Sequence, residues 1–173
     1  MGASVVKAGI GLGSNEGNRL AHLRRAAAEL RLLAVDPGAC RFSPVYETQP
    51  VDCAPGTAPY LNAVAEIDYA APPTDLLDGL QRIEQRLGRP SRRPRNAPRL
   101  IDLDLLYFGN LTLSNQEVVI PHPRIRSRRF VLAPLNDLAP DLVLPGCEQP
   151  VRVLLAETAT SPAVSLLAGD WAR

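Results

Sequence analysis

The order of the elements that the sequence predicts constrains the fold more than any other feature. Runs of apolar and β-branched residues predict four strands, at residues 5–12, 41–48, 62–69 and 100–108. Leucine and alanine at helical spacing predict one helix that begins after Gly17 and stops at Asp36-Pro37-Gly38, and another that Thr74 caps and Gly88 ends. The order strand–helix–strand–strand–helix–strand is a split β-α-β pattern. It predicts a ferredoxin-like α+β sandwich, with helices packed on a mainly antiparallel sheet.

The remaining segments are predicted to be connections and small elements. Residues 49–59 and 89–98 are rich in proline, glycine and small or charged residues, which indicates two exposed loops. After Pro121 we expect short helical pieces that Pro134 and Pro140 interrupt. The tail 151–173 carries no motif. A chain of 173 residues without a repeat or a linker is expected to form one domain over residues 1–173.

Composition excludes several classes of protein. The net charge of +1 gives no general attraction to nucleic acid or to a membrane surface, and no apolar run approaches membrane length. The three cysteines, Cys40, Cys53 and Cys147, form no CxxC pair, so neither a zinc site nor a disulfide framework is expected. The N-terminus does not have the pattern of a signal peptide. We expect a cytoplasmic monomer without a nucleic-acid or membrane partner.

Residues 95–106 carry the strongest chemical signal. They read Arg-Asn-Ala-Pro-Arg-Leu-Ile-Asp-Leu-Asp-Leu-Leu. Carboxylates at positions i and i+2 of a strand face the same way, with Cα atoms about 7 Å apart, so Asp102 and Asp104 share a face. Such a pair suits Mg²⁺, which takes one or two carboxylates together with substrate phosphates, and nearby arginines suit the same phosphates. On spacing alone, a solvated face with both aspartates paired to Arg99 and Arg95 fits equally well.

Other residues carry weaker signals. His122 stands between two prolines, which favours a displayed side chain that can meet a phosphate, although a structural histidine has the same pattern. Tyr60, Asn62 and Phe130 are suited to a pocket for a flat heterocycle, whereas core packing also explains Phe130. The run Gly9-x-Gly11-x-Gly13 lacks the ending of a phosphate-binding loop, so we interpret it as a tight strand-to-helix turn.

Taken together, these segments resemble the 6-hydroxymethyl-7,8-dihydropterin pyrophosphokinase family over about residues 5–145. Residues 95–106 match the signature of that family. The other matching stretches are Gly13-Ser14-Asn15, Ser43-Pro44-Val45-Tyr46-Glu47-Thr48, Tyr60-Leu61-Asn62-Ala63, and Ile120-Pro121-His122-Pro123 followed by Arg128 and Phe130. The chain departs from the family pattern at Ser91, Asn96, Ala97 and Glu117.

The resemblance implies an enzyme that transfers diphosphate from ATP to a pterin alcohol and releases AMP. By similarity, two Mg²⁺ ions bind Asp102 and Asp104, and the catalytic set is completed by Arg89 and Arg99. The residues expected to contact ATP are Gln81, Glu84, Arg89, Arg95, Arg99, Leu105, His122 and Arg128. Those expected to contact the pterin are Thr48, Val51, Tyr60, Asn62 and Phe130. The substrates are small molecules, and the two loops are expected to close over them.

Two alternatives remain at this point. Residues 82–99 hold seven arginines and one acid, Glu84, which is compatible with a nucleic-acid-binding module. The sheet, however, lacks the aromatic-rich strand motif of RNA-binding domains. The other alternative is a non-catalytic relative, against which the intact pair of aspartates argues.

Overall fold

The computed structural model describes residues 4–50, 55–88 and 99–173. Its main sheet has the strand order β5-β1-β4-β3-β8, and the short strand β2 pairs with β4 beside β3. All of these pairings are antiparallel. The strands are β1 (Val6–Ser14), β2 (Arg41–Phe42), β3 (Val45–Thr48), β4 (Tyr60–Tyr69), β5 (Asp102–Phe108) and β8 (Val164–Ala168). A small hairpin of β6 (Leu113–Ser114) and β7 (Val119–Ile120) stands beside the sheet.

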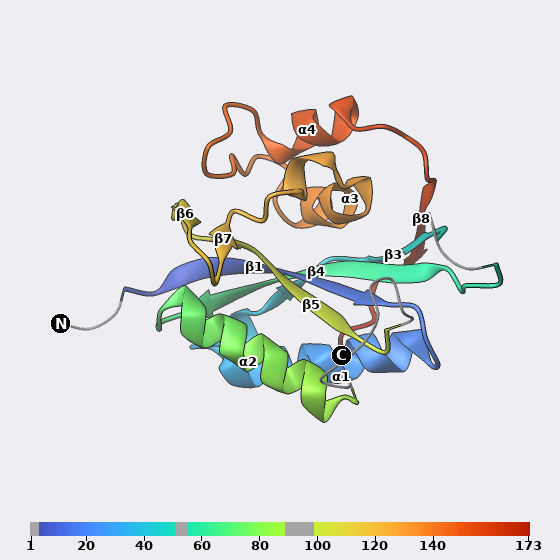
Figure 1. Cartoon of the computed structure of the whole chain (residues 1–173), viewed down its shortest axis with the longest axis horizontal. Helices are drawn as coiled ribbons and strands as arrows, with labels where there is room; N and C mark the ends of the chain where they lie inside the picture. The colour runs from blue at the N-terminus through green and yellow to red at the C-terminus, as the bar shows by residue number, and fades with distance from the viewer. Residues whose placement is uncertain (1–3, 51–54, 89–98) are drawn as a thin grey trace.

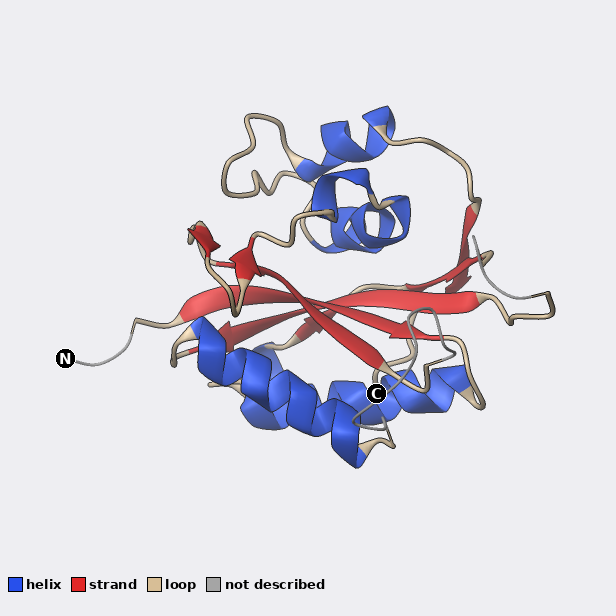
Figure 2. Ribbon diagram, viewed as in Figure 1, coloured by secondary structure: helices blue, strands red, loops and turns tan. Residues whose placement is uncertain are grey.

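Helices cover both faces of the sheet (Figure 1). α1 (Arg19–Leu33) and α2 (Pro73–Arg86) lie on one face, while α3 (Arg129–Leu138) and α4 (Val151–Glu157) lie on the other. Single 3₁₀ turns occupy Pro37–Ala39 and Ile125–Ser127. Figure 2 shows the resulting layers, with the sheet between the two groups of helices. The ferredoxin-like α+β fold that the element order predicts is therefore confirmed.

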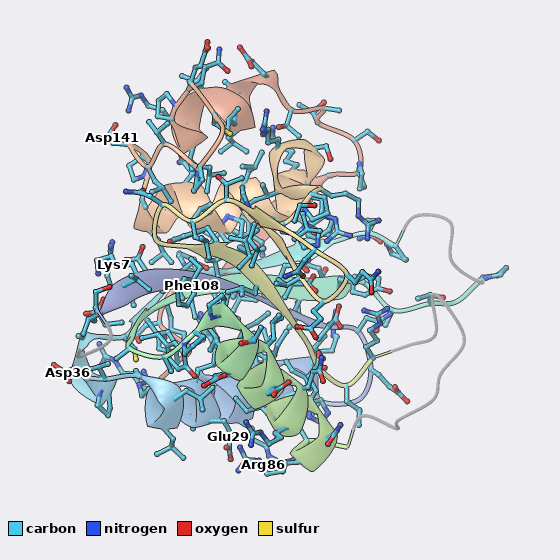
Figure 3. The ribbon with its side chains drawn as sticks, turned by 60° about the vertical axis from the view of Figure 1, so that its left-hand side comes forward. Lys7, Glu29, Asp36, Arg86, Phe108 and Asp141 are labelled. Carbon is cyan, nitrogen blue, oxygen red and sulfur yellow. The ribbon has the colours of Figure 1, made fainter. Side chains whose placement is uncertain are left out.

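Each helical layer buries its own apolar cluster against the sheet. Leu23 and Leu30 of α1 and Leu80 and Ile83 of α2 pack on one face with Leu103 and Leu105 of β5. The partly buried Glu29 and the exposed Arg86 join α1 to α2 by an ion pair of 2.7 Å (Figure 3). The second cluster lies between α3, α4 and the opposite face of the sheet. The polar cavity described below opens on that second face.

The predicted elements are present, with local differences that have physical causes. The strand expected at residues 41–48 is divided into β2 and β3, because Pro44 supplies no N–H to a strand ladder. Thr74 is not the N-cap of α2, since that position belongs to Pro72 and Thr74 lies within the first turn. Pro134 does not interrupt the chain as expected. It lies in the middle of α3, and the helix continues through it to Leu138.

Two predictions about glycines and the tail also need correction. Gly9, Gly11 and Gly13 are not in a turn, because β1 extends through Ser14 and all three lie within the strand. The tail 151–173, for which no structure was predicted, forms α4 and β8 and ends near a buried Trp171. The indole Nε1–H of Trp171 donates to the carbonyl of Ser43 over 2.7 Å, which ties the end of the chain to the core.

Candidate active site

A cavity of about 620 Å³ is lined by residues of the sheet and by Phe130 and Val131 at the start of α3. Its floor is formed by side chains and glycines of β1, β3, β4 and β5, and its roof by the segment that leads into α3. The lining residues are Gly11, Leu12, Gly13, Thr48, Gln49, Tyr60, Asn62, Ala63, Arg99, Asp102, Asp104, Leu106, His122, Arg124, Arg128, Phe130, Val131 and Pro162. Nine residues predicted for the site from the sequence are therefore brought together.

The two aspartates share one face of β5, as their spacing predicts. Asp102 and Asp104 line the cavity, whereas Ile101, Leu103 and Leu105 are buried in the cluster under α1 and α2. Burial and the neighbouring Asp102 carboxylate raise the pKa of Asp104 above its usual value, and His122 and two arginines lower it in part. An additional cation beside the pair would relieve this repulsion.

Arginines contact both carboxylates. A guanidinium nitrogen of Arg99 lies 2.5 Å from Asp102 Oδ2, and one of Arg128 lies 3.6 Å from Asp104 Oδ2. Arg128 also stands over the ring of Phe130, with its guanidinium carbon 5.5 Å from the ring centroid. Each carboxylate of β5 is thus matched by an arginine, Arg99 just before the strand and Arg128 from the roof. This arrangement suits a polyanion bound through metal ions.

His122 has its ring orientation defined by the backbone. The N–H of Arg124 donates to His122 Nδ1 over 3.1 Å, so a neutral ring carries its proton on Nε2. Burial lowers the pKa of His122, with a further lowering from Arg128 and Arg124, although Asp104 raises it. His122 therefore lines the cavity as a hydrogen-bond donor that does not need to be charged.

The other end of the cavity combines an amide with aromatic rings. Asn62 is buried, and its Nδ2 donates to Thr48 Oγ1 over 3.1 Å, which leaves Oδ1 directed toward the glycine side of the floor. Tyr60 and Phe130 are partly buried and line the same space. A planar ligand with hydrogen-bonding edges fits these groups.

Glycines make the floor between these two ends. Gly13 pairs with Asn62 on one side and with Asp102 on the other. A Cβ atom on Gly13 would lie 3.5 Å from Asn62 Oδ1 and 4.0 Å from Asp102 Cβ, inside the space between them. The sequence predicted a turn for these glycines rather than this role. The signal was present, because glycines at every second position of a strand lie on one face.

Three residues predicted to contact ATP lie elsewhere in the structure. Gln81 is exposed on α2, and Leu105 is buried in the cluster beneath the sheet. Glu84 is 4% exposed, and its Oε1 accepts the backbone N–H of Leu103 over 2.7 Å. None of the three lines the cavity among the described residues. Arg89, Arg95 and Val51 belong to the segments outside the described residues.

The side-chain donors at the cavity suit Mg²⁺ better than a metal ion that takes all of its ligands from the protein. Within residues 4–50, 55–88 and 99–173, no three acidic, histidine or cysteine side chains gather as a metal cluster. Mg²⁺ characteristically binds one or two carboxylates and takes its remaining ligands from water and phosphate. The oxygen donors of Asp102 and Asp104, beside arginines that can hold phosphate, match that requirement.

None of the helices in the described part of the chain has both the length and the apolar composition that a membrane-spanning helix needs.

A ferredoxin-like sheet with a polar, arginine-lined cavity on one face defines a small α+β enzyme domain of the phosphate-handling class. Comparison with known proteins gives the family. The family model for 7,8-dihydro-6-hydroxymethylpterin-pyrophosphokinase matches residues 9–140. The chain belongs to this family.

Relatives from bacteria are similar over most of their length. A 2-amino-4-hydroxy-6-hydroxymethyldihydropteridine pyrophosphokinase of Bacillus subtilis is 41% identical over 129 residues, which cover 75% of each chain. One from Pseudomonas aeruginosa is 45% identical over 118 residues, covering 68% of this chain and 67% of the relative. The resemblance noted in the sequence is thus confirmed.

Other relatives are much longer than this chain. The match to the folic acid synthesis protein fol1 of Pneumocystis carinii, 38% identical, spans 79% of this chain but 18% of that protein. The fold is shared with the crystal structure of Plasmodium falciparum HPPK-DHPS wild type with pteroate, at a TM-score of 0.71 and 14% identity. This chain covers 44% of that structure's chain, from 89% of its own length.

Proposed function

We propose that this chain transfers diphosphate from ATP to the hydroxymethyl group of 6-hydroxymethyl-7,8-dihydropterin, with AMP as the second product. The family match over residues 9–140 and the names of the bacterial relatives support this reaction. The observation that carries it is the pair Asp102 and Asp104, which face one cavity together with Arg99, Arg128 and His122. In the reaction the pterin hydroxyl oxygen attacks the β-phosphorus of ATP. The bond between that phosphorus and the oxygen that bridges it to the α-phosphate breaks, AMP leaves with this oxygen, and the hydroxyl proton passes to solvent water.

The metal assignment follows from charge and donor type. Two Mg²⁺ ions held by Asp102 and Asp104 would neutralise the phosphate oxygens and lower the pKa of the attacking hydroxyl. The raised pKa of Asp104 supports this assignment, because burial and then the neighbouring Asp102 disfavour its charged form, which a bound cation would favour. Arg99 and Arg128, which contact these two carboxylates, would then be available to contact phosphate.

The remaining side chains position the two substrates. His122 donates its Nε2–H to a phosphate oxygen, an orientation favoured by the bond between its Nδ1 and Arg124 N–H. Asn62 and Thr48 bind the hydrogen-bonding edge of the pterin, and Tyr60 and Phe130 contact its faces. Val51 stays a predicted contact to the same edge. The nucleotide is expected at the β5 end of the cavity, beside Asp102 and Asp104. Gln81, Glu84, Leu105, Arg89 and Arg95 stay predicted contacts to it. The closure of residues 89–98 over the ligands stays a prediction from the sequence, because these residues lie outside the described part of the chain.

We further propose that residues 1–173 act as one domain. The protein is a monomer in the cytoplasm, and its partners are the two small substrates rather than nucleic acid or a membrane. Clusters of apolar residues on both faces of a single sheet support the one-domain assignment. Size-exclusion chromatography with light scattering tests the monomer.

The decisive experiment identifies the nucleotide product. The protein is incubated with Mg²⁺, ATP and the hydroxymethyl dihydropterin, and the nucleotides are separated by anion-exchange chromatography. AMP formed in equal amount to pterin diphosphate is expected, whereas ADP would indicate a different transfer reaction.

Asp102→Ala and Asp104→Ala are each expected to abolish turnover with the fold retained. Asp78→Ala, which removes an exposed carboxylate from α2 on the other face of the sheet, serves as the control.

A further inference from the structure

One wall of the cavity comes from a part of the chain that the family match does not reach. The family model ends at residue 140, yet Pro162 lines the cavity. Pro162 lies in the connection from α4 to β8. It is partly buried, while Ser161 and Ala163 on either side of it are exposed. The burial of this one residue among exposed neighbours indicates a specific contact with the cavity rather than general packing of the segment.

The register of the sheet places Pro162 at a defined end of the cavity. β8 pairs with β3, and Val164 is the partner of Thr48, itself a lining residue. Strands β3 and β8 stand at the opposite end of the strand order from β5, which carries Asp102 and Asp104. Pro162 therefore closes the end of the cavity that is farthest from the two carboxylates.

The connection that carries Pro162 is held at both ends. Arg129 Nη1 donates to the carbonyls of Leu155 and Thr158, over 3.1 and 3.3 Å, at the C-terminal end of α4. Arg129 lies in α3 between Arg128 and Phe130, which both line the cavity. In Figure 1 the chain then runs from α4 down the end of the sheet into β8. Arg129 thus links the cavity roof to the connection whose Pro162 forms the end wall of the cavity, on the side of Thr48.

We propose that Pro162 is a specificity-determining residue for the heterocyclic substrate and that Arg129 is its positioning residue. The proposal rests on the proposed function. Because the reacting hydroxymethyl group must lie near the carboxylates, the far edge of the heterocycle points toward Thr48 and Pro162. Proline offers a rigid apolar surface with no N–H, so it limits the size of that edge without forming a hydrogen bond. It thereby excludes pterins with an added group at this edge.

The test separates pterin binding from ATP binding. Steady-state constants for both substrates are measured for wild type, Pro162→Ala and the neighbouring control Ser161→Ala. Pro162→Ala is expected to raise the KM of the pterin about tenfold, with the KM of ATP and kcat within about twofold of wild type, since the lost contacts are of methylene size. Its preference for the pterin over an analogue methylated on the pyrimidine edge should fall by a similar factor. Ser161→Ala should match wild type.

Arg129 is tested with a matched arginine. Arg126 Nη2 also donates to a backbone carbonyl of another segment, that of Gly146, over 3.0 Å, but Gly146 precedes α4 and does not lie in the connection that carries Pro162. Arg129→Ala should reproduce the rise in pterin KM and Arg129→Lys should restore part of it, whereas Arg126→Ala should lower thermal stability alone. A purely structural role for Arg129 would lower stability with both KM values unchanged.

The outcomes distinguish this proposal from the proposed function. Wild type that forms AMP, with Pro162→Ala unchanged for both substrates or weakened equally for both, would overturn the role of Pro162 alone. Wild type that forms no AMP would overturn the proposed function. In that case, the affinity for the pterin is measured by calorimetric titration of wild type and of Pro162→Ala, in the presence of Mg²⁺ and a non-hydrolysable ATP analogue. Equal pterin affinity in the two proteins would refute the role of Pro162.

Discussion

Asn15 holds the backbone of Arg99 at two points. Its Oδ1 accepts the N–H of Arg99 over 2.7 Å, and its own N–H donates to the Arg99 carbonyl over 3.0 Å. Asn15 is 3% exposed, so water does not compete for these bonds. The pair fixes the chain just before β5, and with it the origin of the Arg99 side chain that contacts Asp102.

Asn15→Ala is therefore expected to impair both stability and catalysis. It leaves the buried N–H of Arg99 without its acceptor, which should lower the free energy of unfolding by about 1–3 kcal/mol. Because Arg99 is then less well placed, kcat should fall by roughly tenfold or more, as for a misplaced phosphate ligand. Urea unfolding and steady-state kinetics measure the two effects.

Asn18→Ala is the matched control for this variant. Asn18 also accepts a backbone N–H, that of Ala21 over 3.1 Å, as the N-cap of α1. Its loss should lower stability by about 1 kcal/mol and leave kcat unchanged. Similar losses of kcat in both variants would show that reduced stability, rather than the position of Arg99, limits turnover.

Glu84 supports the aspartates from the opposite face of the sheet. Leu103 lies between Asp102 and Asp104 on the edge strand β5, and Glu84 of α2 accepts its N–H in place of a further strand. Glu84→Ala should weaken Mg²⁺ binding and lower the free energy of unfolding by about 1–3 kcal/mol, whereas Glu84→Gln keeps an acceptor and should retain most of both. Calorimetric titration with Mg²⁺ and the ATP analogue provides the measurement. If Glu84 acts only by contacting ATP, Glu84→Ala will weaken nucleotide binding without lowering stability.

Asp104 should make stability depend on pH in a defined direction. Its pKa is raised in the fold by burial and by Asp102, so the native protein binds this proton more tightly than the unfolded chain does. The resulting stability is fully present below the unfolded pKa of about 3.9 and is lost as the pH rises through the higher folded value. Asp104→Asn removes the charge. In the absence of metal, its Tm should therefore exceed that of wild type increasingly as the pH rises through this range.

Magnesium should reverse that order. With Mg²⁺ and the ATP analogue present, the Tm of wild type should rise and that of Asp104→Asn should not. The turnover of Asp104→Asn should fall by about 1000-fold or more, because the variant loses a metal ligand worth several kcal/mol. Calorimetry at several pH values, with Asp78→Asn as the control, records both effects. A Tm for Asp104→Asn below that of wild type throughout the metal-free series would contradict the predicted repulsion.

Gly9 makes room for a buried tyrosine. A Cβ atom at this position would lie 2.0 Å from Cε1 of Tyr107, whose hydroxyl donates to the buried Glu66 over 2.6 Å. Gly9→Ala should thus lower the free energy of unfolding by about 2 kcal/mol or more. In a Tyr107→Val background the same change should have an effect of less than about 0.5 kcal/mol, a coupling that urea unfolding of the four proteins measures.

Gly11→Ala tests whether this effect is steric. Its Cβ would lie 3.5 Å from the side chain of Leu106, an ordinary contact. Gly11→Ala should be tolerated within about 1 kcal/mol, because it requires no movement of a buried ring. A loss as large as that of Gly9→Ala would instead indicate a general requirement for glycine in β1.

Local pattern in the sequence determined the elements and the faces on which their side chains lie. Period-two alternation placed Asp102 and Asp104 on one side of β5, and leucine spacing identified the buried faces of α1 and α2, because these periods follow from backbone geometry alone. The same period existed in Gly9, Gly11 and Gly13. The position of these glycines within a strand was not predicted, because a glycine next to a predicted helix also suits a turn.

Tertiary structure alone decided which distant residues meet. The order of strands joined Asn62 and Asp102 across Gly13, placed Glu84 behind β5, and brought Pro162 to the end of a cavity that its neighbours in sequence do not touch. Such contacts depend on how strands pair and how helices pack over long separations in the chain. No local periodicity encodes them, since the same alternation of residues is compatible with several neighbours in a sheet.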